Sequence, residues 1–152
     1  MLNFLNIRIY PLLLMAILLL AQLIFGRFIK FSLALANASG MTALALLLIG
    51  VVLIMWAGLQ FRIHNTSVNP SKTATTLVTT WLFRLSRNPM YLGMLLILMV
   101  QPLLALRPHL LIFTAVFFII MNYLVIPREE RMMLNTFGEH YQNYCAQTRR
   151  WI

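Results

Sequence analysis

Residues 90–126 read MYLGMLLILMVQPLLALRPHLLIFTAVFFIIMNYLVI and decide the fold, because a very short polar turn separates two apolar segments. The segments cover about residues 90–106 and 110–126, near the lower limit of the roughly 17–25 residues with which a helix crosses a bilayer. Pro108 stands in the turn, between Arg107 and His109. We therefore predict a tight antiparallel helical hairpin, with a kink in its first helix at Pro102.

Two longer apolar segments precede the hairpin, at about residues 10–28 and 41–61. Each is long enough to span a bilayer, and the first is too long for the apolar core of a signal peptide, so we expect it to be retained. The hydrophobic fraction of the chain is 61% and the charged fraction 10%, whereas soluble domains carry roughly 25% charged residues. The sequence predicts one all-α integral membrane domain over residues 1–152, with four transmembrane helices: two N-terminal spans in residues 1–61 and a core in residues 62–152.

The net charge of +9 is compatible with nucleic acid, but the basic residues lie mostly at the ends of apolar segments, where membrane proteins place them. We therefore predict no nucleic-acid partner. With a cytoplasmic N-terminus, nine basic residues lie inside and three outside, so both termini are predicted to be cytoplasmic, in a bacterial inner membrane. The inside set is Arg8, Arg62, Lys72, Arg84, Arg87, Arg128, Arg131, Arg149 and Arg150, and the outside set is Arg27, Lys30 and Arg107.

This topology places the loop 62–88 and the tail 127–152 on the same face of the membrane. The loop is longer than a simple connector and loops of this length are often functional. The tail is predicted to be one interfacial helix that starts at Pro127. Gly138 would weaken this helix or allow close packing. Its apolar stripe consists of Met133, Phe137, Tyr141 and Tyr144.

Cysteine and histidine give no sign of a metal or a disulfide. Cys145 is the sole cysteine, so no intrachain disulfide forms. The histidines are scattered, and no cysteine or acid stands at ligand spacing around them. They are His64, His109 and His140. No metal site is predicted.

Two adjacent glutamates directly follow the fourth apolar segment, in a chain with one other acidic residue. Glu129 and Glu130 could complement the positive end of a helix dipole and pair with Arg128 and Arg131. They could also bind a cationic ligand at the membrane surface. The residue types alone leave both interpretations open.

The segment that enters the hairpin, RLSRNPMYLGML at residues 84–95, has the residue types of a ligand site. Pro89 can start a helix whose first N–H groups bind an anion. Tyr91 offers a ring and a hydroxyl, and Gly93 permits close approach of a ligand or another helix. Each residue also has an ordinary role in a basic flank, an aromatic belt or a helix contact.

The hairpin should bring the start of its first helix close to the end of its second, so these two features could share one pocket. Helix N–H groups beside two carboxylates would suit a zwitterion with a further positive centre, such as S-adenosylmethionine. The adenine of that molecule needs an apolar slot, for which Leu77, Val78 and Trp81 are candidates. The residues allow this ligand without selecting it uniquely.

The motifs RNPMYLG at 87–93, Glu129-Glu130, FGEHYQNY at 137–144 and RRW at 149–151 occur in this order, after LVT at 77–79. Together they resemble the R-H-P-x-Y-x-G motif, the paired glutamates and the F-G-x-x-Y-x-x-Y and R-W ending of the isoprenylcysteine carboxyl methyltransferase and phospholipid methyltransferase superfamily. The resemblance covers about residues 62–152. The first two spans match only in being hydrophobic.

The resemblance implies a membrane-embedded methyltransferase that binds S-adenosylmethionine near the cytoplasmic face. The cofactor contacts that it implies are Leu77, Val78, Arg87, Asn88, Pro89, Tyr91, Gly93, Glu129 and Glu130. Two positions depart from the usual pattern. Asn88 replaces the more usual histidine, which leaves a side chain that donates or accepts hydrogen bonds. Trp81-Leu82 replaces a frequent Gly-Pro, which could alter the mouth of the site.

The predicted reaction is methyl transfer to a lipophilic or membrane-bound acceptor. The carboxylate of a prenylated cysteine, a phospholipid amine and a hydrophobic thiol all remain open. An amine must lose a proton, and Glu130 is the predicted base for that step. The alternative is a non-catalytic membrane scaffold or assembly protein, which would bind no cofactor.

Overall fold

The structure is a computed structural model that describes residues 9–26, 38–64 and 76–152. Every regular element among these residues is a helix. The elements are α1 (Pro11–Gly26), α2 (Ala38–Ile63), the 3-10 turn η3 (Trp81–Arg84), α3 (Pro89–Leu104), the 3-10 turn η4 (Pro108–Leu110), α4 (Leu111–Ile120), the π-helical turn η5 (Met121–Val125), α5 (Ile126–Phe137) and α6 (Glu139–Gln147). Arg8, Arg27, Lys30 and Lys72 of the orientation prediction lie outside the described residues, as does much of the loop 62–88.

Two helical stretches are long and apolar enough to cross a membrane. They are Ala38–Ile63, with 26 residues, and Pro108–Phe137, with 30 residues. The apolar helices α1 and α3 are shorter, with 16 residues each. Large apolar side chains such as Leu12 and Met55 point outward from the bundle, with exposed fractions of 60% and 70%. Helices with such surfaces fit a bilayer better than water.

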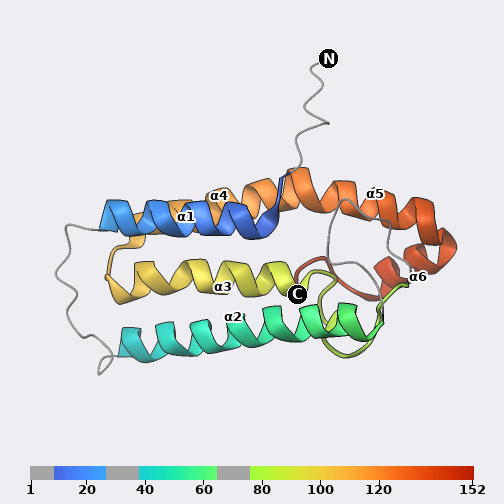
Figure 1. Cartoon of the computed structure of the whole chain (residues 1–152), viewed down its shortest axis with the longest axis horizontal. Coiled ribbons are helices and arrows are strands. Elements are labelled where there is room, and N and C mark those ends of the chain that lie inside the picture. The colour runs from blue at the N-terminus through green and yellow to red at the C-terminus, as the bar shows by residue number, and fades with distance from the viewer. Residues whose placement is uncertain (1–8, 27–37, 65–75) are drawn as a thin grey trace, which may run out of the picture.

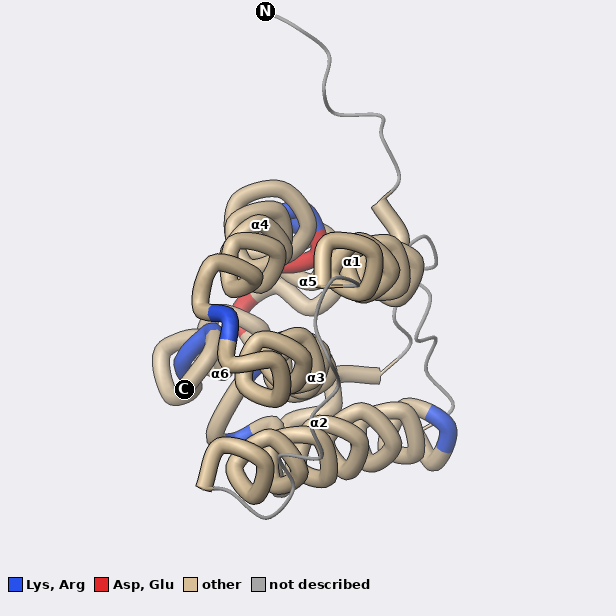
Figure 2. The backbone as a smooth tube through the Cα atoms, turned by 90° about the vertical axis from the view of Figure 1, so that its left-hand side faces the viewer, with Lys and Arg blue, Asp and Glu red and all other residues tan. Residues whose placement is uncertain are grey.

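The four apolar helices form a bundle in which α3 lies between α2 on one side and the pair α1 and α4 on the other (Figure 1, Figure 2). The start of α1, the end of α2, the start of α3 and the end of α4 lie at the same end of the bundle (Figure 1). That end also carries α5, α6 and the C-terminal residues. The hairpin therefore gathers the segments that the sequence analysis expected on one face.

α2 and α3 approach each other closely where two glycines meet. A Cβ atom on Gly93 would lie 2.6 Å from the carbonyl oxygen of Gly50, and a Cβ atom on Gly50 would lie 2.8 Å from the carbonyl oxygen of Gly93. No larger residue fits at either position unless the helices move apart. Small residues that let backbones touch are typical of helix contacts in membranes.

Pro102 lies inside α3 and deprives the helix of one hydrogen bond. The carbonyl oxygen that loses its donor is that of Leu98, four residues earlier. Gln22 Nε2 of α1 donates to this oxygen at 3.0 Å, and Thr114 Oγ1 of α4 donates to it at 3.1 Å. The proline thus creates an acceptor at which three helices are joined, in a region where an unsatisfied carbonyl is costly.

The tight hairpin is confirmed. α3 ends at Leu104 and the chain turns back through η4 into α4. The Arg107 N–H donates to the carbonyl oxygen of Pro102 at 3.0 Å, and Leu106 adopts a φ of 52°. The two helices of the hairpin are in contact, although α3 packs more extensively on α2.

The predicted start of the tail helix at Pro127 was wrong, because the fourth apolar helix does not end there. α4, η5 and α5 form one helical stretch that ends at Phe137. In an α-helix the proline ring clashes with the carbonyl four residues earlier. The wider π-turn at Met121–Val125, which ends two residues before the proline, relieves this conflict and lets the helix continue.

The prediction that the tail forms one helix was also wrong. Gly138 has φ 53° and ψ −125°, a conformation that glycine alone adopts readily, and it separates α5 from α6. Apart from Gly138 and its two chain neighbours, no atom of the described residues lies within 4 Å of a Cβ atom built on Gly138, so this glycine serves the turn rather than close packing. The predicted stripe is divided between two helices, and α6 buries Tyr141 and Tyr144.

Candidate functional site

The start of α3 lies within the protein, and Pro89 is fully buried. Pro89 occupies its first turn, as predicted, where a missing N–H breaks no helical bond. Asn88 is the N-cap residue, yet within the described residues its side chain makes no capping bond. Its Nδ2 donates instead to the carbonyl oxygen of Arg150 at 3.0 Å. The first-turn N–H groups of α3 are therefore left without a side-chain cap.

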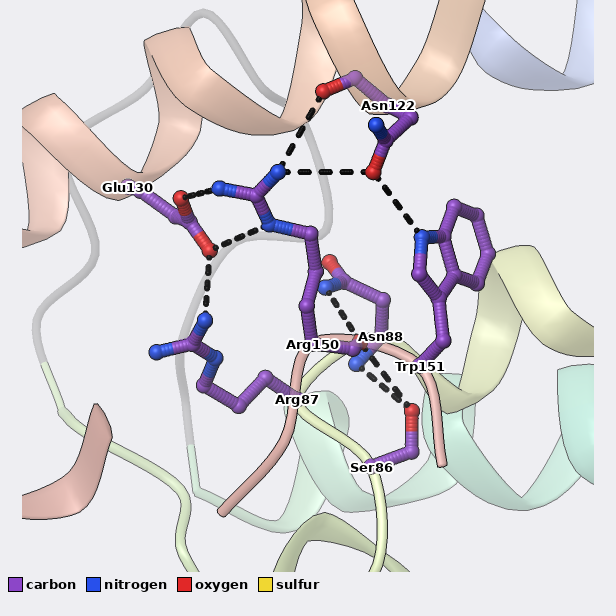
Figure 3. Close-up of polar contacts among 7 residues, drawn as sticks. All are labelled: Ser86, Arg87, Asn88, Asn122, Glu130, Arg150 and Trp151. Atoms are coloured by element: carbon purple, nitrogen blue, oxygen red, sulfur yellow. Dashed lines mark hydrogen bonds and ion pairs between the residues drawn. The ribbon is translucent and has the colours of Figure 1, made fainter. Parts of the chain in front are cut away.

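Residues 148–151, which we call the C-terminal strap, lie across this segment (Figure 3). The Arg87 N–H donates to the carbonyl oxygen of Arg149 at 3.0 Å. The carbonyl oxygen of Arg150 accepts a second bond, from Ser86 Oγ at 3.4 Å. The strap thus fastens the end of the chain to the residues that precede α3.

Glu130 is paired with two arginines (Figure 3). Arg87 Nη2 lies 3.0 Å from Glu130 Oε1. Arg150 donates to both carboxylate oxygens, from Nε to Oε1 at 3.1 Å and from Nη2 to Oε2 at 2.5 Å. Such two-point contacts are among the stronger interactions of a carboxylate. Glu130 therefore joins α5, the segment before α3 and the strap.

The π-turn η5 supplies a second anchor for Arg150. The Ile126 N–H bonds five residues back, and Pro127 has no N–H, so the carbonyl oxygen of Asn122 loses its usual helical donor. Arg150 Nη1 donates to that oxygen at 3.4 Å and to Asn122 Oδ1 at 3.3 Å. Asn122 Oδ1 also accepts from Trp151 Nε1 at 3.0 Å (Figure 3).

Glu129 has a different neighbour. The hydroxyl of Tyr91 on α3 donates to Glu129 Oε1 at 2.6 Å. Successive residues of a helix point about 100° apart, so the two adjacent glutamates face different elements. Because α5 continues from η5 without a free N-terminus, a helix dipole does not account for Glu129. The Tyr91–Glu129 bond joins the first motif directly to the paired glutamates.

The tail tyrosines support the loop that precedes the first motif. The hydroxyl of Tyr144 donates to the carbonyl oxygen of Phe83 at 2.6 Å. Burial raises the pKa of Tyr144, against an opposing effect of Arg87, and the hydroxyl therefore stays a neutral donor. The C-terminal helix α6 thereby holds η3 in place.

The predicted apolar slot is only partly assembled. Val78 is buried in a cluster with Ala57 and Phe83, and Met90 packs against this cluster. Leu77 is partly buried. Trp81 points outward, with 78% of its surface exposed and a φ of 53°. Val78 is thus close to the first turn of α3, whereas Trp81 does not line an enclosed slot.

The structure brings most of the expected site residues together at one end of the bundle. These are Arg87, Asn88, Pro89, Tyr91, Glu129 and Glu130. Gly93 lies apart from them, buried against Gly50 on the side of α3 that faces α2. Its role in this structure is the helix contact.

Three residues of the network were not singled out from the sequence. They are Ser86, Asn122 and Arg150, and the sequence marks Arg150 only as part of a terminal motif and a basic flank. Asn122 carries a usable signal, since an amide side chain inside an apolar span is seldom there without a partner. The partner itself lies 28 residues further along the chain, which no local pattern indicates.

Comparison with known protein families gives one match. A family model described as phospholipid methyltransferase matches residues 38–140, which is more than half of the chain and includes both motifs that meet at the Tyr91–Glu129 bond. Searches of curated proteins and of solved structures gave no match.

Proposed function

Because the chain belongs to the phospholipid methyltransferase family, we propose that it transfers a methyl group from S-adenosylmethionine to a lipophilic acceptor at the membrane surface. The observation that carries this proposal is the contact between Tyr91 and Glu129, which unites the two motifs in one polar cluster. The cluster lies at the end of apolar helices, where a lipid head group and a water-soluble cofactor can meet.

The donors of this cluster fit the carboxylate of such a cofactor. Arg87 Nε is buried and has no hydrogen-bond partner among the described residues. A buried donor without a partner is unfavourable, and a ligand oxygen would relieve it. The uncapped N-terminus of α3 begins two residues away and also favours an anion. Arg87 and the first turn of α3 would therefore hold the cofactor carboxylate.

The acceptors of the cluster fit the positive groups of the cofactor. Glu129 and Glu130 form an acidic pair beside Tyr91, and part of the charge of Glu130 is balanced by Arg87 and Arg150. S-adenosylmethionine, when bound, supplies a methyl group on a positively charged sulfur. Leu77 and Val78, with Met90 nearby, would contribute apolar surface for the adenine.

The protein's part in the reaction is to orient the reactants and to exclude water. The C-terminal strap and Tyr91 fix the carboxylates, while the apolar helices bring the acceptor from the lipid side. The acceptor classes that fit are a prenylated cysteine carboxylate, a phospholipid amine and a hydrophobic thiol. We further propose that α1, α2, α3 and the stretch from Pro108 all span a bacterial inner membrane, with both termini in the cytoplasm.

Calorimetric titration of the detergent-purified protein with S-adenosylhomocysteine tests the proposal. We expect saturable binding by the wild-type protein. Arg87→Lys keeps the positive charge but removes the Nε donor, so its affinity should fall by about 10-fold or more, the value of a charge-assisted hydrogen bond. Arg84→Lys is the matched control, because Arg84 is exposed, and its affinity should be unchanged. Absence of binding by folded wild-type protein would refute the proposed function.

A further inference from the structure

The 3-10 turn η3 and the residue after it present large apolar side chains away from the protein. Trp81 is 78% exposed and Leu85 is 67% exposed, whereas Phe83 between them is buried. Trp81 also has a φ of 53°, a backbone conformation that costs free energy in a residue with a side chain of this size. Such a conformation persists only where the surrounding structure holds it. The outward direction of Trp81 is therefore a fixed feature of the loop.

The inward side of the turn is attached to two helices. The ring centroid of Phe83 lies 5.8 Å from that of Trp56 and 5.5 Å from that of Phe61, both on α2. The carbonyl oxygen of Phe83 accepts a hydrogen bond from the Tyr144 hydroxyl of α6 at 2.6 Å. η3 is thus held between α2 and α6, and its exposed side chains stay outward.

The attachment to α2 also sets the depth of η3 in a membrane. α2 has 26 residues and measures about 39 Å, whereas the hydrocarbon layer is about 30 Å thick. Trp56 and Phe61 belong to the last eight residues of this helix, and Arg62 is the basic residue of its last turn. A spanning α2 therefore brings this end, with η3 beside it, to the level at which acyl chains meet head groups. Tryptophan is enriched at that level in membrane proteins.

The charges around η3 suit the phosphate groups of lipids. Arg84 in the turn and Arg62 at the end of α2 are exposed, and neither forms an ion pair within the described residues. The connecting residues 62–88 contain no acid. An anionic lipid supplies a phosphate for Arg84 and acyl chains for Trp81 and Leu85. A second copy of the chain would instead bring the same positive charges together.

We propose that η3 is a lipid-binding element of this protein, with an anionic phospholipid as its ligand. Trp81 and Leu85 lie among the upper parts of the acyl chains, and Arg84 binds the phosphate group, in the leaflet at the site end of the bundle. The contact holds the loop before α3 at the membrane surface. It is separate from methyl transfer, because the outward side chains of η3 take no part in the polar cluster around Glu129 and Glu130.

Fluorescence quenching by brominated lipids tests the proposal on the whole chain in nanodiscs. The difference between the emission of the wild-type protein and that of Trp81→Phe isolates Trp81 from the other two tryptophans. The nanodiscs contain phosphatidylcholine with a minor fraction of phosphatidylglycerol, and one lipid or the other carries bromine near the top of its acyl chains. We expect both lipids to quench Trp81, with a relative affinity for phosphatidylglycerol about fivefold higher, the effect of one basic residue at an anionic surface.

Arg84→Gln should remove this preference, while quenching by phosphatidylcholine persists. Arg131→Gln is the matched control, because Arg131 is exposed on α5 and carries the same charge, and the wild-type preference should remain. Three results would each contradict the proposal: Trp81 emission that no brominated lipid quenches, equal affinities for the two lipids in wild-type protein, or an unchanged preference in Arg84→Gln.

A second copy of the chain as the occupant would be recognised from the number of chains in each nanodisc. Trp81 emission would then differ between discs that hold one chain and discs that hold two, and this result would likewise overturn the proposal. The quenching measurement does not depend on binding of S-adenosylhomocysteine. Failure of the lipid contact and failure of the proposed methyl transfer are therefore observed separately.

Discussion

Asn122 holds Arg150 and Trp151 of the C-terminal strap through its side-chain oxygen. Asn122→Leu keeps the size of the side chain and the backbone carbonyl contact but removes both bonds. We expect the free energy of unfolding in mixed micelles to fall by about 1–3 kcal/mol, because a partly buried arginine loses an acceptor. Asn135→Leu is the control, since Asn135 is exposed on α5. Equal losses in the two variants would show that the strap gains no stability from Asn122.

At the scale of single residues, the sequence predicted which side chains gather but not how they pair. Glu129 and Glu130 are identical in type, so composition gives no reason to separate them. Their difference comes from the 100° step between neighbours on a helix, which turns one toward Tyr91 and the other toward two arginines. That direction depends on the π-turn before them, which neither the apolar periodicity nor the position of Pro127 indicated.

At the scale of elements, Gly138 determines where the tail changes direction. Gly138→Ala forces a Cβ atom into a conformation with φ 53° and ψ −125°, so the free energy of unfolding should fall by about 1–3 kcal/mol. Gly58→Ala is the matched control. At both positions, no described atom beyond the adjoining chain lies within 4 Å of the new Cβ atom, but Gly58 is inside α2. There alanine should stabilise by up to about 1 kcal/mol. Denaturant titration of the two variants measures both changes, and equal shifts would contradict the strain argument.

The helices themselves were largely predictable, because apolar length determines them. The hairpin followed from a turn of three residues and was confirmed. The prediction for the tail was wrong because the commonest helical position of proline is the first turn, whereas Pro127 lies inside a longer helical stretch. A proline can also follow a π-turn inside a helix, and only the path of the surrounding chain distinguishes the two cases. The contact of Gly50 with Gly93 likewise depends on which helices become neighbours.

At the scale of the whole molecule, the four-span topology predicts opposite sides for two positions. Cys145, the sole cysteine, lies on α6 at the site end of the bundle, and His109 lies in the hairpin turn at the other end. In intact bacterial cells a membrane-impermeant maleimide should leave Cys145 unlabelled until the cells are opened. In a Cys145→Ser background, His109→Cys should be labelled in intact cells. The opposite pattern would mean that the orientation is inverted.

The gathering of both motifs at one end was predictable from the hairpin alone, since a tight turn brings the start of one helix beside the end of the next. Other parts of the overall arrangement were not. The strap reaches the segment before α3 through Asn88, 62 residues away in the sequence, and Glu130 is reached by Arg150 over 20 residues. Contacts of that kind depend on the path of α6, which Gly138 redirects.

The length of the helical stretch from Pro108 to Phe137 determines where its end lies relative to the membrane surface. Its 30 residues measure about 45 Å, whereas the hydrocarbon layer of a bilayer is about 30 Å thick. With the hairpin turn at the far surface, about 20 residues cross the layer, and the helix emerges close to Glu129 and Glu130. A rigid helix, rather than a mobile tail, then sets the depth of the carboxylates. A lipid can present its head group at that depth without leaving its own leaflet.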